Sequence, residues 1–213
     1  MKIKPERYER IRQTVAYRQL DFTVVLEHFS DMHNIGAVLR TCESAGIQNV
    51  HIVPHPEEER MKNPVLGKRT TAGARKWLNV YLHETIDDCI EKLRKPYSTI
   101  YCTALGDRAT ELFDADLTES TAIILGNEKM GVSERACQLA DGNLLIPMMG
   151  MVRSLNVSVA CSAIVFEAVR QRKLAGMYRE DIDFKKQGKQ ELFEDFLRRH
   201  ELQYKGRKPK RED

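Results

Sequence analysis

The chain has 213 residues, of which 42% are hydrophobic and 31% charged, and its net charge is +3. This composition is that of a globular protein and excludes collagen-like, low-complexity and wholly disordered chains. At roughly 100 to 200 residues per domain, we expect one sizeable domain with extensions. No apolar run approaches the ~18 residues that span a bilayer, and the N-terminus is charged where a secretion signal is apolar. We therefore expect a cytoplasmic protein that does not enter a membrane.

Positive charge gathers at both ends of the chain. Residues 1–20 hold six Lys or Arg against two acidic residues, and residues 170–213 hold fourteen against nine. The ends therefore carry +4 and +5, which leaves −6 for residues 21–169. Basic extensions on an acidic body favour a phosphate-rich partner, because neutralised phosphates release counterions. For the densest cluster, residues 205–211, a solvated terminus that only aids solubility is the alternative.

Hydrophobic periodicity divides the chain into short strands and helices. A basic amphipathic helix is expected over Pro5 to Gln19, and from Asp21 onward β-branched runs alternate with helical segments. This alternation predicts an α/β fold with a mostly parallel sheet and helices on both faces. The expected strands are 22–26, 50–53, 78–82, 99–102, 122–125 and 144–146. The expected helices after the first are 35–45, 86–94, 133–140, 157–174 and 189–199. The predicted units are a basic N-terminal extension (1–20), an α/β domain (21–175) and a basic C-terminal extension (176–213).

Ligands of parallel sheets bind at the carboxyl ends of the strands, so we expect the functional residues in the loops after the strands. The first such stretch is Asp31 to Thr41. Asn34 is a favourable helix N-cap, and the apolar residues after it form one stripe, which leaves Arg40 on another face of the helix. A capped helix with a surface arginine is the alternative.

The second stretch, residues 123–132, is an apolar strand that ends in Gly126, Asn127 and Glu128, followed by Gly131. Glycines at this point can bring the backbone close to a ligand, although a plain turn explains them equally well. The glycine-rich fingerprints of dinucleotide-binding and P-loop proteins are missing, so kinases, NTPases and dehydrogenases lose support.

The third stretch, residues 145–160, continues from a strand into a methionine-rich loop and then into a long helix that begins near Asn156. Such a loop can enclose an apolar or aromatic ligand, and Ser154 and Asn156 can cap the helix or bind a substrate. Methionines that only fill a core are the alternative.

Metal and thiol sites receive little support from the sequence. His51 and His55 are four residues apart on a strand that runs into Pro54, and no third ligand is apparent, so we expect no metal. The five cysteines are odd in number and widely spaced without a CxxC pair, which predicts reduced thiols. Cys161 has no histidine near it in sequence, so a thiol nucleophile is not expected.

Together the three stretches resemble the three motifs of the SpoU branch of the SPOUT RNA methyltransferases, over about residues 21–172. The matching residues are Asn34, Gly36, Ala37 and Arg40, then Gly126 to Glu128 with Gly131, and then Ile146 to Met148 with Ser154 to Ala160. The short basic helix before the domain makes the chain most similar to the tRNA guanosine-2′-O-methyltransferases of that branch.

The resemblance implies a C-terminal trefoil knot, a homodimer with the active site across its interface, and S-adenosyl-L-methionine as cofactor. The implied cofactor-binding residues are Thr103, Ala104, Leu105, Leu125, Gly126, Asn127, Ile146, Met149, Ser154 and Leu155.

The implied reaction is methyl transfer to the ribose 2′-hydroxyl of D-loop guanosine 18 in tRNA. Arg40 is then the essential residue. The resemblance implies that it and the ribose are positioned by Asn34, Glu128, Ser154 and Asn156. Because a guanidinium is effectively always protonated, we expect Arg40 to stabilise the developing alkoxide rather than to act as a base. The residues expected to contact RNA are Arg7, Arg10, Arg12, Arg18, His33, Arg170, Arg172 and Lys173.

Three other functions stay open at this point. One is 2′-O-methylation of another RNA, such as ribosomal RNA or another tRNA position. The second is a knotted RNA-binding protein that has lost catalysis, which the intact motif residues disfavour. The third is a small-molecule methyltransferase, which the charged ends disfavour.

Overall fold

The computed structural model describes residues 3–29, 31–57, 71–104, 109–127, 130–202 and 210–211. The strands are β1 (Gln19–Glu27), β2 (Ile47–Val53), β3 (Asn79–Leu82), β4 (Thr99–Cys102), β5 (Ala109–Glu111), β6 (Thr121–Leu125), β7 (Gly142–Leu145) and β8 (Lys210–Arg211). The helices are α1 (Pro5–Ala16), α2 (Met32–Ser44), the 3₁₀ helix η2 (Ala74–Lys76), α4 (Ile86–Leu93), α5 (Glu134–Leu139), α6 (Val157–Leu174) and α7 (Gln190–Glu201). Every strand and helix expected from the sequence is present. None of the described helices is both long and apolar enough to cross a membrane.

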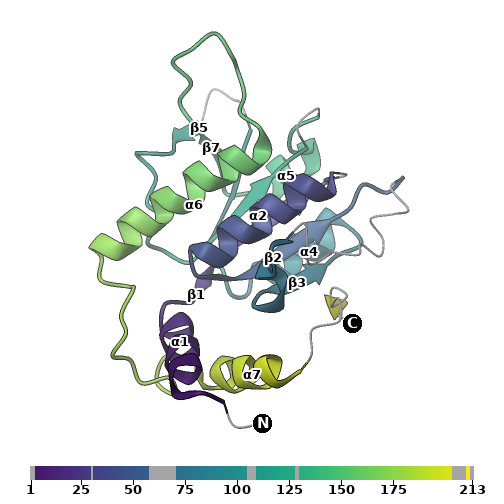
Figure 1. Ribbon diagram of the computed structural model, residues 1–213. Coiled ribbons are helices and arrows are strands. Elements are labelled where there is room, and N and C mark those ends of the chain that lie inside the picture. Colours follow the sequence, from purple (N-terminus) through teal and green to yellow (C-terminus); the bar gives the residue numbers. More distant parts are fainter. Residues whose placement is uncertain are drawn as a thin grey trace.

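The described strands pair in parallel in one sheet, in the order β5-β7-β4-β6-β1-β2-β3-β8 (Figure 1). β1 lies in its interior, where Val24 and Leu26 face one apolar cluster and Val25 faces another. A parallel strand that is covered on both faces has no solvent-facing side. This is why the strands of this sequence are continuous apolar runs rather than alternating patterns.

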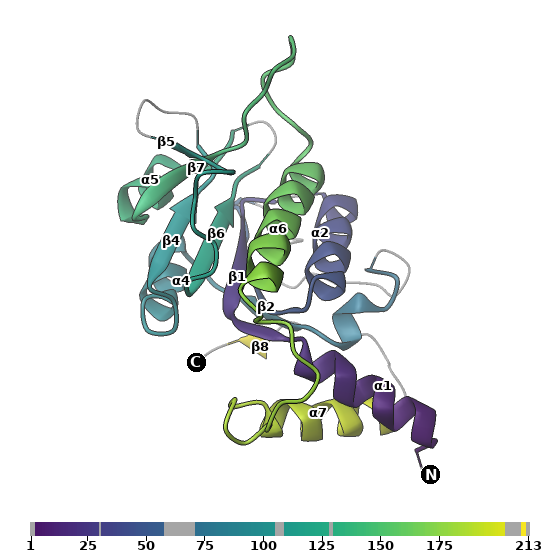
Figure 2. The same ribbon diagram turned by 90° about the vertical axis from the view of Figure 1, so that its left-hand side faces the viewer.

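Helices cover both faces of the sheet (Figure 2). α2 and α6 pack on one face, where Ile35 and Ile164 join the larger core cluster. α4 and α5 pack on the other face, where Ile90 and Ala136 join the second cluster. The predicted α/β fold with helices on both faces is therefore confirmed.

The helices at the two ends of the chain pack against each other beside the sheet (Figures 1 and 2). Ile11 and Val15 of α1 form a separate apolar cluster with Phe193 and Phe196 of α7. α1 is shorter than the predicted helix, because the chain turns at Tyr17 and enters β1 at Gln19. The helices near the two ends of the chain thus form one apolar unit beside the sheet.

Two strands were not expected from the sequence. β5 is the three-residue segment Ala-Thr-Glu, and β8 lies in the basic tail and pairs with β3. Neither segment has an apolar pattern, but the open edge of a sheet can pair with the backbone of any sequence. Residues 205–209 of the same tail lie outside the described residues.

The predicted trefoil knot concerns the C-terminal half of the sheet. β7 lies between β4 and β5, although both precede it in the chain. The knot depends on how the connection between β4 and β5 passes the later part of the chain. Residues 105–108 of that connection lie outside the described residues, so the knot stays a prediction.

Arg172, which was expected to contact RNA, is buried at the end of α6. Its guanidinium donates hydrogen bonds to the carbonyl oxygens of Leu117 at 2.8 Å and Glu119 at 2.6 Å. It also donates to the carboxylate of Asp21 at 2.6 Å. The prediction was wrong for this residue, because the fold supplies enough fixed acceptors to satisfy a buried guanidinium.

Arg18 is a second correction of the same kind, since its side chain is also fully buried. It donates to the carbonyl oxygen of Ile47 at 2.9 Å and to the carboxylate of Glu43 at 2.9 Å. Counting charges along the sequence cannot distinguish such an internal arginine from a surface one.

Replacing Arg172 with lysine should destabilise the fold. An ammonium cannot reproduce the fork of donors, so buried carbonyl oxygens lose their partners. We expect the free energy of unfolding in urea to fall by about 2–4 kcal/mol. Lys173→Met, at the exposed neighbouring position, should change it by less than about 0.5 kcal/mol. Equal effects of the two substitutions would contradict the structural role of Arg172.

Candidate active site

A cavity of about 390 Å³ opens at the carboxyl edge of the sheet, between the ends of β4, β6 and β7. The loops after these strands and the first turn of α6 form its walls. Parallel sheets bind ligands at this edge, where loops that differ in sequence converge. The lining residues are Thr103, Ala104, Leu125, Gly126, Asn127, Met130, Gly131, Val132, Leu144, Leu145, Ile146, Met148, Arg153, Ser154, Leu155, Val157 and Ala160.

Gly126, directly after β6, allows a very close backbone approach on one side of the cavity. A Cβ atom added there would lie 2.1 Å from the carbonyl carbon of Gly131. Asn127 and Gly131 exchange two backbone hydrogen bonds of 3.1 and 2.7 Å, which hold this geometry. Gly131 itself has a φ of +70°, a conformation that glycine adopts without steric cost. The glycines noted in the second motif are therefore required by the backbone.

The carboxyl end of β1 supports the same loop. Glu27 is buried and accepts hydrogen bonds from the backbone N–H of Ser133 at 2.8 Å and from its hydroxyl at 2.6 Å. The side-chain amide of Asn127 donates to the carbonyl oxygen of His28 at 3.0 Å. His28 has a φ of +58°, a strained conformation for a residue with a side chain, and such strain often occurs at functional sites. These contacts fix Asn127 beside the cavity.

Asn34 and Asn156 connect α2 to α6 beside the cavity. The Asn156 amide donates to the side-chain oxygen of Asn34 at 3.3 Å, and Asn156 caps α6 by accepting from the N–H of Ser158 at 2.9 Å. The sequence predicts Asn34 as the N-cap of α2, but this is wrong. Asp31 is the cap and accepts from the N–H of His33 at 2.8 Å. An acceptor three residues earlier starts the helix earlier, and Asn34 lies within it.

Arg40 lies apart from the cavity within one chain. It follows Asn34 by six residues on α2, which is about 9 Å along a helix axis and away from the carboxyl edge of the sheet. Its side chain is exposed and does not line the cavity. The structure therefore brings Asn34 and Asn156 together, but not Arg40 and the cavity.

Most residues implied for cofactor binding lie in the cavity wall. They are Thr103, Ala104, Leu125, Gly126, Asn127, Ile146, Ser154 and Leu155. Met149 is 92% exposed and points away, whereas its neighbour Met148 lines the cavity, since successive residues of an extended loop point to opposite sides. Leu105 and Glu128 lie outside the described residues. The roles of all these residues stay predictions.

The residues expected to contact RNA separate into three groups. Arg18 and Arg172 are internal, as described above. Arg12 and Arg170 are accessible but paired with Glu9 and Glu167, each at 2.7 Å. The exposed ones are Arg7, Arg10, His33 and Lys173.

Sequence reasoning missed several cavity residues, of which Arg153 is the most informative. Arg153 is the one charged residue between Ile146 and Asn156, a signal that the predicted set did not use. Val157 and Ala160 of the third motif also line the cavity, although they were not among the predicted binding residues. Val132 lines it as well, but an apolar residue outside the motifs carries no such signal in the sequence.

The cavity fits the S-adenosylmethionine that the motif resemblance implies. Its walls are largely apolar, and Leu125, Ile146 and Leu155 provide a surface for a purine ring. Its volume lies in the range of small-molecule sites. Arg153 offers a guanidinium for a carboxylate, and the bare backbone at Gly126 allows close approach of a ligand.

Comparison with known proteins gives a consistent result. The sequence model described as the SpoU rRNA Methylase family matches residues 21–166. The tRNA (guanosine(18)-2′-O)-methyltransferase of Thermus thermophilus is 42% identical over 176 residues, which cover 81% of this chain and 86% of that protein.

Two solved structures are similar in fold. The A. aeolicus TrmH/SpoU tRNA modifying enzyme superposes with a TM-score of 0.79 at 28% identity, covering 93% of this chain and 98% of that one. The SpoU methyltransferase AviRb from Streptomyces viridochromogenes, solved in complex with the cofactor AdoMet, has a TM-score of 0.63 at 25% identity. That match covers 73% of this chain and 62% of the other.

Gly126→Ala tests the close backbone approach. Because the new methyl group would collide with backbone atoms, we expect the free energy of unfolding to fall by about 2–4 kcal/mol in urea denaturation. Gly150→Ala is the matched control, since a Cβ at Gly150 meets nothing within 4 Å, and it should change stability by less than about 0.5 kcal/mol. A Gly126→Ala protein as stable as the control would contradict the close approach of the backbone at Gly126 to that at Gly131.

Proposed function

Because this chain belongs to the SpoU methylase family, we propose that it transfers a methyl group from S-adenosyl-L-methionine to the ribose 2′-oxygen of guanosine 18 in the D-loop of tRNA. The observation that carries the proposal is the cavity at the ends of β4, β6 and β7, beside the Asn34–Asn156 contact. The relative with 42% identity bears this activity in its name. The identity covers most of both chains, so the similarity is not confined to one motif.

The bound cofactor supplies an electrophilic methyl group on a sulfonium sulfur. The protein must then orient the ribose and stabilise its 2′-oxygen, since a hydroxyl is a poor nucleophile. Ser154, Asn156 and Asn34 offer neutral polar groups beside the cavity for holding the ribose. Arg40 binds the neighbouring phosphate and stabilises the developing alkoxide, while the phosphate or solvent takes the proton. Glu128 holds either Arg40 or the incoming base. The reaction so described uses no metal.

The active site is completed by a second copy of the chain. Two observations support a homodimer. Arg40 does not line the cavity of its own chain, and α6 is apolar on the side that faces away from the sheet, where Val159 is 51% and Phe166 50% exposed. A helix that is apolar on both sides is normally buried on both.

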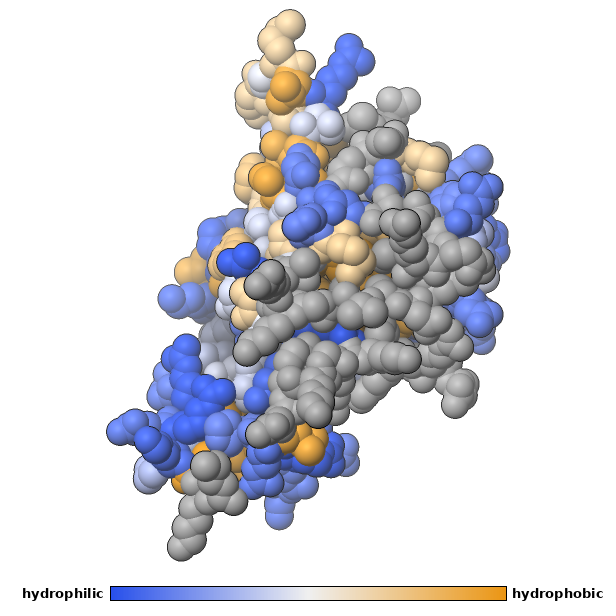
Figure 3. Space-filling model, turned by 45° about the vertical axis from the view of Figure 1, so that its right-hand side comes forward, coloured by the Kyte–Doolittle hydropathy of each residue, from blue (hydrophilic) through white to orange (hydrophobic). Residues whose placement is uncertain are grey.

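The loop between β7 and α6 extends the same apolar surface. Met149 and Met151 are 92% and 99% exposed, and Val152 is 64% exposed. Figure 3 shows apolar side chains gathered on this projecting part of the molecule. Exposed apolar surface of this kind marks interaction sites. In the dimer, this surface is covered and Arg40 of one protomer reaches the cavity of the other.

The basic ends of the chain hold the tRNA. Residues 1–20 and 176–213 flank the catalytic residues 21–175, and Arg7 and Arg10 of α1 are exposed for phosphate contacts. Such contacts set affinity and register more than sequence choice. The protein acts in the cytoplasm, where tRNA and S-adenosylmethionine are available.

The substrate is tested by methyl transfer from labelled S-adenosylmethionine to an unmodified tRNA transcript. The controls are the same transcript with guanosine 18 replaced by adenosine, and a ribosomal RNA fragment. We expect label only in the first, in a nuclease-resistant 2′-O-methyl dinucleotide. Label in the ribosomal fragment would overturn the tRNA assignment but keep the methyltransferase. No label in any RNA would favour a binding protein without catalysis.

The shared active site is tested by mixing two inactive variants. Arg40→Ala removes the arginine, and Ala104→Trp fills the cavity. If each site combines residues of two protomers, unfolding and refolding an equal mixture should restore about a quarter of wild-type activity, since half the dimers are mixed and each has one intact site. Either variant refolded alone should stay inactive. A mixture that remains inactive, although mixed dimers form, would place the whole site within one chain.

A further inference from the structure

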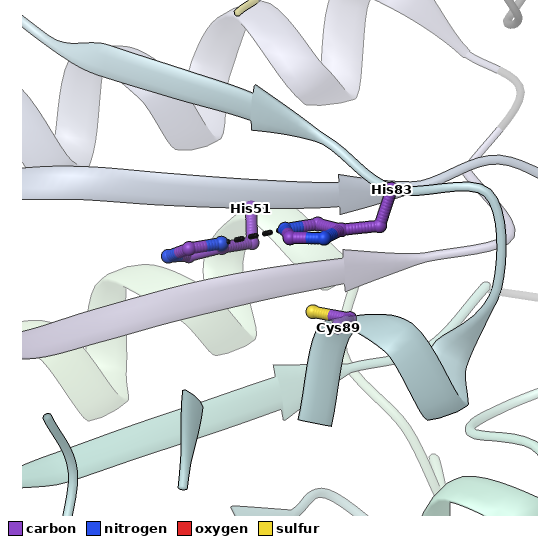
Figure 4. A group of neighbouring side chains, drawn as sticks. All are labelled: His51, His83 and Cys89. Carbon is purple, nitrogen blue, oxygen red and sulfur yellow. Dashed lines mark hydrogen bonds between the residues drawn. The ribbon is translucent and has the colours of Figure 1, made fainter. Parts of the chain in front are cut away.

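Three side chains of metal-ligand type meet on the face of the sheet that α4 covers (Figure 4). His51 lies in β2, His83 directly follows β3, and Cys89 lies in α4. One ligand atom from each residue, two ring nitrogens and a sulfur, lies within 4.8 Å of the other two. The three residues are 6%, 4% and 0% exposed. The fold therefore collects them in a buried cluster.

In each of the two imidazole rings, one nitrogen points toward a nitrogen of the other ring. Nδ1 of His51 and Nε2 of His83 are 2.8 Å apart and share one proton in a hydrogen bond. This hydrogen bond requires a lone pair on one of the two nitrogens, and a neutral imidazole nitrogen with a lone pair is the form that binds metal ions.

We propose that His51, His83 and Cys89 form a binding site for one Zn²⁺ ion. Two imidazoles and a thiolate bind this borderline-soft ion in preference to Mg²⁺ or Ca²⁺, because those ions take oxygen ligands. Tetrahedral Zn²⁺ with bonds of 2.0–2.1 Å places two nitrogens about 3.3 Å apart. The rings therefore have to separate by about 0.5 Å from their 2.8 Å contact. A water molecule takes the fourth position.

Binding rearranges protons without any redox step. The proton between the rings moves to the outer nitrogen of the ring that carries it, so that Nδ1 of His51 and Nε2 of His83 each offer a lone pair to the ion. The Cys89 thiol releases its proton to solvent, because only the thiolate is a ligand. The ion and the Cys89 thiolate together keep a net charge of +1 beside the positive charge of Lys92. Repulsion from both charges disfavours binding of a second ion.

This site is separate from the methyl-transfer cavity. β2 and β3 lie on one side of β1 in the sheet, and the cavity strands β4, β6 and β7 lie on the other. The ion would tie β2, the end of β3 and α4 together and so stabilise the fold. His55, four residues after His51 in the sequence, does not join this cluster, because its ring lies against that of His28 with centroids 4.9 Å apart.

The test is a Co²⁺ titration of the full-length, chelator-treated protein followed by absorption spectroscopy. We expect one equivalent to bind, with tetrahedral d–d bands and a thiolate-to-Co²⁺ charge-transfer band, and Zn²⁺ to displace it. Cys89→Ser should abolish the charge-transfer band. Cys137→Ser, which removes a thiol outside the cluster, should keep it. His83→Gln should weaken Co²⁺ binding by at least about tenfold.

Thermal unfolding provides a second readout that does not depend on the colour of the ion. Zn²⁺ at a hundred times its Kd should raise the Tm of the wild type by roughly 5–10 °C and leave that of Cys89→Ser unchanged. Circular dichroism checks that each variant is folded. A wild type without a charge-transfer band, or a Cys89→Ser protein that retains it, would overturn the proposal.

Discussion

Parallel pairing of every described strand is the constraint on which the rest of this structure depends. Parallel strands end at the same edge of a sheet, so the segments after β4, β6 and β7 meet there although the chain separates them widely. The same pairing requires crossover connections, and these supply the helices on both faces. The cavity is therefore a consequence of strand direction, and its chemistry is a consequence of which residues follow each strand.

The two edges of the sheet have different tasks. At the amino edge, Arg172 joins the end of α6 to Asp21 in the first part of β1 and to the segment before β6, through the carbonyl oxygens of Leu117 and Glu119. A buried guanidinium is tolerated only when its donors are satisfied, so this edge is fixed. At the carboxyl edge, Glu27 and Asn127 hold loops around a cavity instead. The fold is secured at one edge and encloses the candidate site at the other.

α6 links this chemistry to assembly. Its first turn lines the cavity, one side packs on the sheet, and its outer side presents Val159 and Phe166 to solvent. The proposed dimer would bury that outer side. It would also bring Arg40 of one protomer to the cavity of its partner, since Arg40 does not line the cavity of its own chain. Cofactor binding and subunit contact would then depend on the same helix, which explains why the third motif continues from the loop into the helix.

Much of this protein is determined by local sequence. The alternation of β-branched runs and helical periodicity is sufficient to predict the layered α/β fold, because burial on both faces demands continuous apolar strands. The motif residues Gly126, Ser154 and Asn156 mark the candidate site, because glycine freedom and helix capping are local properties. Tertiary structure decided what depends on partners distant in the chain. Arg18 and Arg172 became internal because carbonyl acceptors from other segments surround them. Similarly, His51 gained His83 and Cys89 as neighbours through strand pairing and helix packing. The sequence alone determines which charged and metal-ligand side chains are present, but the distance between two of them is determined only when the chain folds.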